Sequence, residues 1–210
     1  MKKILHLCAD TGSDSKPYAD DPGYEVILIG SDIGVENYTP PDDVYGIFAN
    51  PVCSEFSVAR EGYKFGTNIR QEIDIDKGLF LVRECQRIIA EANPTFWVIE
   101  NPATGKLKDY LGAPQYTYEP WWYGSPWTKK TSLWGKFNIP NRVYHDWEDV
   151  PKINGLYTRP NRPKPSLAFM HKSHYKYIEE FHTLPAPNSD MEFRSLCSQK
   201  FAEAFYNANL

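Results

Sequence analysis

Four short apolar runs, each ending at a polar or proline-containing turn, divide the first half of the chain. Continuous apolar runs are typical of strands that are buried on both faces of a parallel sheet. They predict strands at residues 3–8, 26–29, 44–49 and 96–99. The polar turn at residues 10–15, which is rich in helix-capping residues, follows the first of these strands.

Helical periodicity replaces these runs in two segments. Over residues 74–92 the apolar side chains recur at steps of three and four residues, which predicts an amphipathic helix that stops at Asn93 and Pro94. Residues 198–209 repeat the pattern and predict a final helix. The alternation of strands and helices favours an α/β fold of Rossmann-like type, a mostly parallel sheet with helices on both faces. In such a sheet, functional residues gather at the carboxyl ends of the strands.

The 210 residues are enough for one sizeable core, and we expect a single domain over residues 1–210. Aromatic residues make up 15% of the chain and prolines number 17, and both are frequent at about 115–190, where we expect loops. No apolar run approaches the roughly 20 residues of a membrane span. The four cysteines form no C-x-x-C pair, which predicts reduced thiols in a cytoplasmic protein and argues against a metal site.

The net charge of −4 is unevenly distributed along the chain. Residues 120–178 contain ten lysines and arginines against three acids, Asp146, Glu148 and Asp149. Such asymmetry favours one basic face for an anionic partner on an otherwise acidic body. A solvated loop without a partner is the equally good alternative.

Cys53 is the first residue that could carry chemistry. It follows a predicted strand through the turn Asn50-Pro51-Val52. A cysteine past a strand end and near a helix start can have a lowered thiol pKa and attack an electrophilic carbon. The alternative is a small buried apolar side chain, the commonest role of a lone cysteine.

Glu100 holds the corresponding position after the fourth predicted strand, and Pro102 restricts the turn that follows it. A carboxyl group in a dry cleft there could donate a proton. A helix N-cap or an ion-pair partner is the alternative. A thiol and an acid at the ends of two strands of one sheet support catalysis more strongly together than either does alone.

Five segments, in the same order, resemble motifs of the DNA cytosine-5 methyltransferases, and most closely those of the short forms found in phages and prophages. Residues 6–13 resemble the D-L-F-x-G-x-G loop for S-adenosylmethionine, residues 50–57 the P-P-C-x-x-F-S nucleophile motif, and residues 100–102 the E-N-V or E-N-P motif. Residues 123–134 resemble the Y-G-x-P-x-x-K-x-T-x-L-W stretch of the short forms, and residues 194–205 resemble their C-terminal signature.

The resemblance implies a Rossmann-like methyltransferase fold and methyl transfer from S-adenosylmethionine to C5 of a flipped-out cytosine in DNA. It implies that Cys53 adds to C6 of the ring while Glu100 gives a proton to N3. The residues that it implies for the cofactor are Cys8, Ala9, Asp10, Thr11, Gly12, Ser13, Asp32, Asn50 and Pro51.

DNA is the implied partner. The residues expected to contact DNA or the flipped base are Ser57, Asn101, Lys129, Lys130, Thr131, Arg159, Arg162 and Lys164. Trp121, Trp122, Tyr123 and Trp127 could stack on bases or could belong to the core. Only about 60 residues separate Trp134 from Arg194, so we expect no separate large target-recognition domain. The implied location is the cytoplasm of a bacterium or of a phage-infected host.

The departures from the family pattern cluster at the cofactor. Asp10 replaces the first glycine of the loop, and His6 replaces the acid at its start. Gly30 stands where an acid for the ribose hydroxyls is expected, although Asp32 could substitute for it, and Val52 replaces the proline before the nucleophile. Two interpretations fit: an active methyltransferase with an unusual cofactor loop, or a descendant that binds DNA or a protein partner without methyl transfer.

Overall fold

A computed structural model of the chain describes residues 1–9, 11–56 and 73–210. These residues form two compact units. Unit 1 comprises residues 1–9, 23–117 and 131–137, and unit 2 comprises residues 10–22, 118–130 and 138–210. The single domain expected over residues 1–210 stays a prediction.

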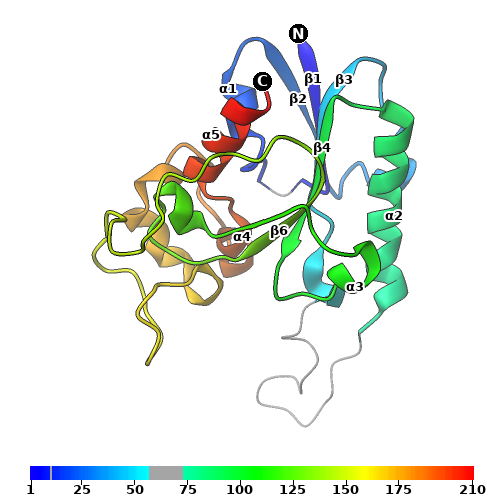
Figure 1. The fold of residues 1–210 in the computed structure, drawn as a ribbon. Coiled ribbons are helices and arrows are strands. Elements are labelled where there is room, and N and C mark those ends of the chain that lie inside the picture. Colours follow the sequence, from blue (N-terminus) through cyan, green and yellow to red (C-terminus); the bar gives the residue numbers. More distant parts are fainter. Residues whose placement is uncertain (10, 57–72) are drawn as a thin grey trace. The chain divides into compact units, whose positions relative to one another are not determined.

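A six-stranded sheet, in the order β2-β1-β3-β4-β6-β5, is the frame of unit 1 (Figure 1). Its strands are β1 (Lys2–Leu7), β2 (Tyr24–Ile29), β3 (Val44–Ala49), β4 (Phe96–Pro102), β5 (Tyr116–Tyr118) and β6 (Thr131–Lys136). β1 pairs in parallel with β2 and β3, β3 pairs in parallel with β4, and β6 runs antiparallel to β4. The predicted α/β fold with a mostly parallel sheet is therefore confirmed.

The order of the strands reverses at β1, because the chain goes from β1 to β2 on one side and then crosses to β3 on the other. In an open α/β sheet this switch point is where the carboxyl ends of neighbouring strands leave a crevice for ligands. The residues that follow β1 and β3, which begin with Cys8 and Asn50, stand at this point.

Most element bounds differ from the sequence prediction by one or two residues, and two differences are larger. β4 runs to Pro102, so Glu100 and Asn101 belong to the strand instead of the turn after it. The cause is β6, whose residues Leu133 and Ser132 lie opposite Glu100 and Asn101 and extend the ladder. β5, β6 and several short helices also occupy the region at 115–190 where we expected loops.

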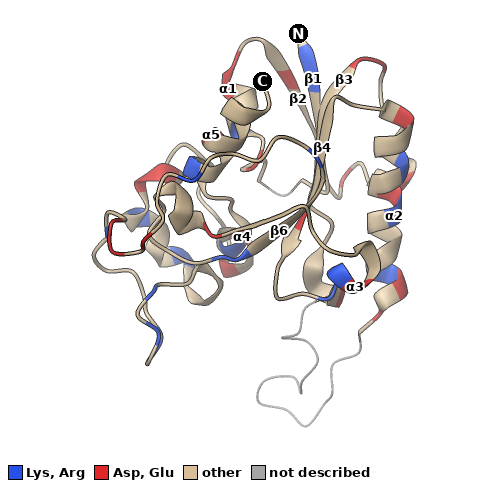
Figure 2. Ribbon diagram, viewed as in Figure 1, with Lys and Arg blue, Asp and Glu red and all other residues tan. Residues whose placement is uncertain are grey.

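The predicted amphipathic helix is α2 (Ile75–Ala92), which covers one face of the sheet. Asp74 caps its first turn by accepting a hydrogen bond from the backbone N–H of Lys77, and Asn93 ends it in the left-handed conformation. Its buried side chains join those of the strands in one core, which includes Leu5, Leu7, Ile47, Ile99, Val82, Cys85 and Ile88. Charged residues of both signs lie along the helix (Figure 2).

Unit 2 has short helices around a second apolar core. They are α1 (Lys16–Asp20), α4 (Asp190–Ser195), α5 (Gln199–Ala208) and the 3-10 helices η4 (Pro120–Tyr123), η5 (Leu167–Phe169), η6 (Lys172–Tyr177) and η7 (Glu179–Phe181). The core comprises Trp127, Leu167, Met170, Ile178, Phe181, Leu184, Phe193 and Leu196. Trp127 therefore has the core role that was one of the two alternatives for it.

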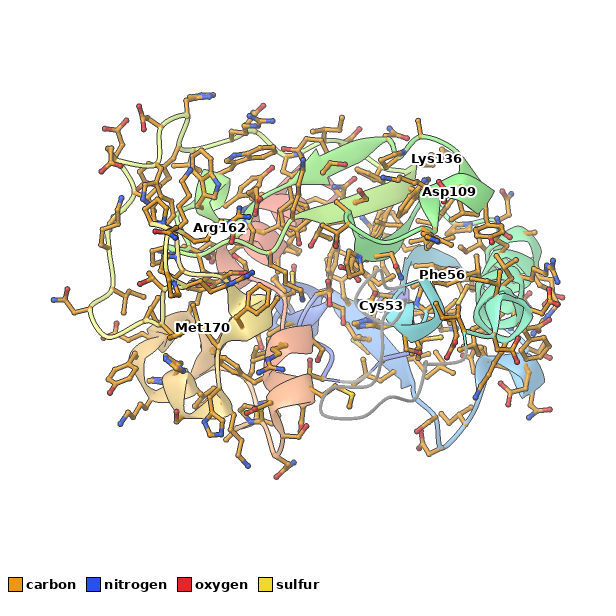
Figure 3. The ribbon with its side chains drawn as sticks, turned by 90° about the horizontal axis from the view of Figure 1, so that it is seen from below. Cys53, Phe56, Asp109, Lys136, Arg162 and Met170 are labelled. Carbon is orange, nitrogen blue, oxygen red and sulfur yellow. The ribbon has the colours of Figure 1, made fainter. Side chains whose placement is uncertain are left out.

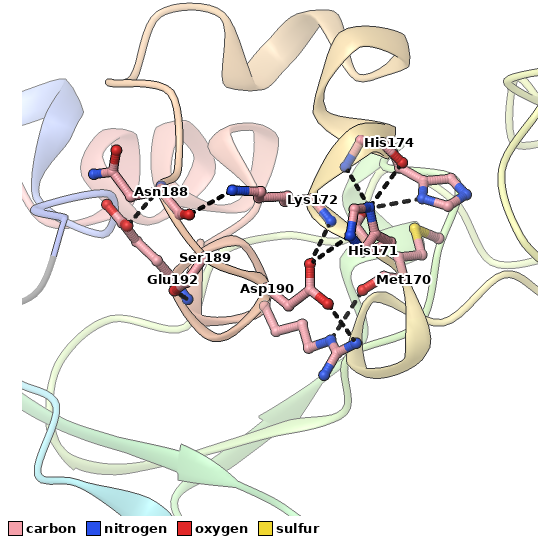
Figure 4. Close-up of polar contacts among 10 residues, drawn as sticks. Met170, His171, Lys172, His174, Asn188, Ser189, Asp190 and Glu192 are labelled. Carbon is pink, nitrogen blue, oxygen red and sulfur yellow. Dashed lines mark hydrogen bonds and ion pairs between the residues drawn. The ribbon is translucent and has the colours of Figure 1, made fainter.

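A polar cluster joins η6 to α4 at the surface of unit 2 (Figure 4). The carboxylate of Asp190 accepts a hydrogen bond of 2.9 Å from the backbone N–H of Lys172 and lies 3.5 Å from Nε2 of His171. The guanidinium of Arg194 reaches the same carboxylate and donates to the carbonyl oxygen of Met170. These contacts hold the pKa of Asp190 below its ordinary value, chiefly through the Lys172 N–H.

None of the described helices is long and apolar enough to cross a membrane. No disulfide joins the four cysteines, all of which lie in the described ranges.

Candidate active site

Cys53 opens a short 3-10 helix, η2 (Cys53–Phe56), directly after the turn that follows β3. The backbone N–H of Asn50 donates a hydrogen bond of 3.0 Å to the carbonyl oxygen of Leu7, which ties this turn to the end of β1. The Cys53 side chain is partly exposed, whereas Phe56 at the other end of η2 is buried in the core (Figure 3). Cys53 therefore combines partial exposure with a backbone that is anchored on both sides.

Two hydrogen bonds hold the Cys53 segment against the segment that contains Glu100. The side-chain amide Nδ2 of Asn101 donates to the carbonyl oxygen of Pro51 at 3.1 Å, and the backbone N–H of Lys106 donates to the carbonyl oxygen of Phe56 at 2.9 Å. One bond lies before Cys53 in the sequence and the other after it. The structure thus brings together the two motifs that the sequence analysis singled out.

Glu100 stands at the same rim of the sheet. Ala49 of β3 is level with Ile99 of β4, so Glu100 is one residue beyond the last paired position, as Asn50 is. Ile99 packs in the core beneath α2, and because side chains alternate along a strand, Glu100 projects from the opposite face. Its side chain is partly exposed, as a proton donor to a bound substrate has to be.

The residues expected at the cofactor divide between the two units. Cys8, Ala9, Asp32, Asn50 and Pro51 belong to unit 1 and follow the carboxyl ends of β1, β2 and β3. Thr11, Gly12 and Ser13 belong to unit 2, where the Ser13 hydroxyl accepts a hydrogen bond of 3.0 Å from the backbone N–H of Cys197. Asp10 lies outside the described residues.

The end of β2 offers features that fit a ribose-bearing cofactor. A Cβ atom added at Gly30 would lie 3.0 Å from Oδ1 of Asp32 and 3.2 Å from the carbonyl oxygen of Ala9, so the glycine leaves room that a side chain would fill. The Asp32 carboxylate therefore lies beside the end of β2, close to the position where such sheets carry an acid for ribose hydroxyls. Cys8 has a positive φ of 53°, which turns the chain sharply after β1.

Several residues expected at DNA have internal contacts. The side chains of Asn101 and Thr131 are fully buried in unit 1. The ammonium of Lys129 donates hydrogen bonds to the carbonyl oxygens of Ser195 and Leu196 in unit 2. The side chains of Asn101 and Thr131 therefore offer no exposed surface for direct contact with DNA in this conformation. Ser57 lies outside the described residues.

The other basic residues that were expected to contact DNA lie against aromatic rings or are exposed to solvent. The Arg159 guanidinium lies over the ring of Phe169, at 4.2 Å from its centroid. The Lys164 ammonium lies 4.5 Å from the ring centroid of Trp121 and 5.2 Å from that of Trp147. Lys130 and Arg162 are exposed. Aromatic faces thus hold two of these cations in place at the surface of unit 2.

A cavity of about 400 Å³ lies in unit 1, on the face of the sheet that α2 covers. Its lining residues are Gln86, Trp97, Ile99, Leu111, Ala113, Gln115, Trp134 and Gly135. Neither Cys53 nor Glu100 lines this cavity.

Two carboxylates of unit 2 did not emerge from the sequence analysis. Burial raises the pKa of Glu119, whose Oε2 accepts a hydrogen bond from the backbone N–H of Lys129. Burial also raises the pKa of Glu180, which accepts hydrogen bonds from the Ser125 hydroxyl and from the backbone N–H of Gln199. Neither lies in a recognisable motif, and only the tertiary structure brings their donors to them.

A mostly parallel sheet whose order reverses at β1, with an anchored thiol and an acid at the rim of neighbouring strands, defines a Rossmann-like fold of the methyltransferase type. The chain is similar to a protein of Frog virus 3 (isolate Goorha) named probable DNA (cytosine-5)-methyltransferase, with 31% identity over 153 residues. The match covers 63% of this chain and 69% of that protein. The chain belongs to the DNA (cytosine-5)-methyltransferase family. No family model matches it, and the phage or prophage form stays a prediction.

Proposed function

We propose that the protein transfers a methyl group from S-adenosylmethionine to C5 of a flipped-out cytosine in DNA. The observation that carries this proposal is the pair of hydrogen bonds on either side of Cys53, from Asn101 to Pro51 and from Lys106 to Phe56. These bonds fix the nucleophile turn against the strand that carries Glu100. Family membership supports the same reaction.

Cys53 and Glu100 divide the activation of the base between them. C5 of cytosine is a poor nucleophile. The Cys53 thiolate forms a bond to C6 while the Glu100 carboxyl group gives its proton to N3, and the electron pair of the C5–C6 double bond then makes C5 nucleophilic. After C5 has accepted the methyl group, a base removes the C5 proton and the bond from sulfur to C6 breaks, which returns the thiolate. N3 gives its proton back to the Glu100 carboxylate as the neutral ring re-forms. The target base has to leave the duplex, because C6 is inaccessible inside the stack.

S-adenosylmethionine, when bound, supplies an electrophilic methyl group on a sulfonium. We propose that Cys8, Ala9, Asn50 and Pro51 hold it at the switch point of the sheet. Asp32 would accept hydrogen bonds from the ribose hydroxyls, since its carboxylate lies beside Gly30 at the end of β2.

Unit 2 would supply the contacts to the DNA backbone. Lysines and arginines recur along its segment between β6 and α4, which contains η5, η6 and η7 (Figure 2). We assign the phosphate contacts to Lys130, Arg159, Arg162 and Lys164. Two of these cations already lie on aromatic faces, so less side-chain freedom is lost when they meet phosphate. Phosphate contacts would give affinity that depends on salt more than on sequence.

The test is incubation of the protein with DNA and S-adenosylmethionine labelled on its methyl group. The expected result is label in 5-methylcytosine of the DNA, which Cys53→Ala abolishes and Glu100→Gln strongly reduces. Unlabelled DNA, together with calorimetry that detects no binding of the donor, would reject the proposal.

The departures at the cofactor favour one alternative, a protein of this family that binds DNA or a protein partner without methyl transfer. His6, which replaces the acid of the loop, is buried in β1. This alternative predicts DNA binding that is sensitive to salt and survives Cys53→Ala, with no label transferred by the wild-type protein.

A further inference from the structure

Two cysteines from distant parts of the sequence meet within unit 1. Cys8 directly follows β1, and Cys85 lies in the middle of α2. Their sulfur atoms are 3.8 Å apart, which is a close contact between two thiols. This distance is much longer than the roughly 2.05 Å bond of a disulfide. Cys8 is partly exposed, whereas Cys85 has no exposed surface.

We propose that Cys8 and Cys85 form a redox modification site that a hydroperoxide, such as hydrogen peroxide, converts to a disulfide. The Cys8 thiolate attacks one peroxide oxygen, which forms a sulfur–oxygen bond, breaks the oxygen–oxygen bond and releases hydroxide. The Cys85 sulfur then attacks the sulfur of Cys8, which forms the disulfide and displaces the oxygen as water. In sum, two thiols and one peroxide give one disulfide and two molecules of water.

The surroundings of the two thiols set this order of events. A peroxide can reach the partly exposed Cys8 but cannot reach the buried Cys85. The hydrogen bond with Cys8, with burial as the second cause, raises the pKa of the Cys85 thiol well above its ordinary value. Cys85 is therefore the less reactive of the two thiols toward peroxide, and Cys8 is oxidised first. Cys85 resolves the Cys8 sulfenic acid because its sulfur already lies 3.8 Å away, and its proton leaves with the displaced oxygen as water.

The other two thiols have different surroundings. Cys197 is buried in unit 2, whereas Cys8 and Cys85 both belong to unit 1. Cys53 is partly exposed and can itself react with peroxide, whereas Cys85 places its sulfur 3.8 Å from that of Cys8. The resulting cross-link would join the end of β1 to α2 and does not require the protein to be a methyltransferase.

Cleavage after glutamate distinguishes the possible disulfides. Complete digestion at Glu25, Glu36, Glu55, Glu84 and Glu91 places Cys8 in residues 1–25, Cys53 in residues 37–55 and Cys85 in residues 85–91. The intact protein is treated with hydrogen peroxide, remaining thiols are alkylated, and the digest is analysed by mass spectrometry without reduction. We expect peptide 1–25 joined to peptide 85–91, and we expect dithiothreitol to separate them.

Cys85→Ala is the matched variant, and its circular dichroism spectrum checks that it folds. In this variant the cross-link should be lost and Cys8 should persist as a sulfenic acid that dimedone traps, whereas Cys53→Ala should keep the cross-link. A disulfide from Cys8 to Cys53, or a Cys8 that is recovered fully alkylated after peroxide treatment of the wild-type protein, would overturn the proposal. The wild-type peptide map decides the matter even if Cys85→Ala does not fold.

Discussion

The side-chain amide of Asn101 donates a hydrogen bond of 3.1 Å to the carbonyl oxygen of Pro51, two residues before Cys53. Asn101 is fully buried, and its Oδ1 atom has no hydrogen-bond partner within the part of the chain that the structure describes. Burial of an amide with one unsatisfied atom costs free energy of folding. The hydrogen bond from Asn101 to Pro51 offsets this cost. The strand that carries Glu100 thus also supports the turn that precedes Cys53.

Replacement of Asn101 by alanine should therefore affect both stability and catalysis. The variant leaves the Pro51 carbonyl without its partner and should lower the free energy of unfolding by about 1–3 kcal/mol in urea titrations. We expect kcat for methyl transfer to fall more than KM changes, because the turn that carries Cys53 loses its support.

Asn209→Ala is the control for this prediction. Asn209 is also buried, and its amide donates to the carbonyl oxygens of Asn138 and Phe205 within unit 2. This variant should lose comparable stability and keep its rate per folded molecule. Equal rates in the two variants would show that Asn101 has a purely structural role.

Gly78 of α2 predicts an unusual effect of a helix-stabilising substitution. Alanine favours an exposed helix by about 1 kcal/mol over glycine. A Cβ atom at Gly78, however, would lie 2.9 Å from Cβ of Glu55 and 2.9 Å from Cζ of Phe56, both in η2 behind Cys53. We expect Gly78→Ala to displace η2 and to lower both the unfolding free energy and the rate of adduct formation. Lys77→Ala, at the exposed neighbouring position, should change neither quantity by much.

Glu180 predicts a pH dependence of stability. Burial raises its pKa above the ordinary value of 4.5, so the folded state holds its proton more tightly than the unfolded state does. The stability from this group is fully present below pH 4.5 and is lost as pH rises through the folded pKa.

The variant Glu180→Gln removes this titration. Urea unfolding across a pH series should show the wild-type protein losing stability relative to Glu180→Gln as pH rises. Glu179→Gln, which changes the exposed neighbour, should track the wild-type protein. A constant difference between the wild-type protein and Glu180→Gln would contradict this assignment.

The basic loop of unit 2 predicts the salt dependence of DNA binding. If Arg162 contacts one phosphate, Arg162→Gln should reduce the slope of log K against log salt by about 0.9. The effect should be the same on DNA of different sequences, because a phosphate contact carries no sequence information. Arg83→Gln removes the same charge from the exposed face of α2 and should leave the slope unchanged.

The sequence predicted the positions of the parallel strands well, because their apolar runs are unambiguous. The expected burial on both faces is wrong for β2, which lies at the edge of the sheet and leaves Leu28 46% exposed. The third strand, Val44–Ala49, has the predicted bounds, and α2 begins one residue after its predicted start. β6 was missed, since Thr131 and Ser132 are polar residues that become buried only through pairing with β4. Tertiary pairing decided this element, and local propensity did not.

The candidate site was predictable only as a pair of residues at strand ends. The motifs around Cys53 and Glu100 indicated that both lie at one rim of the sheet, and the register of β3 with β4 agrees. The role of Asn101 could not be foreseen, because its burial depends on the packing of residues 50–56 beside residues 101–106. Gly78 is an isolated glycine within a helical pattern, and such a glycine indicates close packing. The structure shows this packing against Glu55 and Phe56.

Duplex DNA with 5-fluorocytosine at the target tests the central claim most directly. After Cys53 has attacked C6 and the methyl group has been transferred, fluorine cannot leave C5 as a proton does, so the enzyme stays bound. With S-adenosylmethionine present, we predict a complex of protein and DNA that survives denaturing electrophoresis, and peptide mapping should place the attachment at Cys53. The complex should be absent for Cys53→Ser. Methyl transfer to ordinary DNA without any such complex, or an attachment at another residue, would contradict the account.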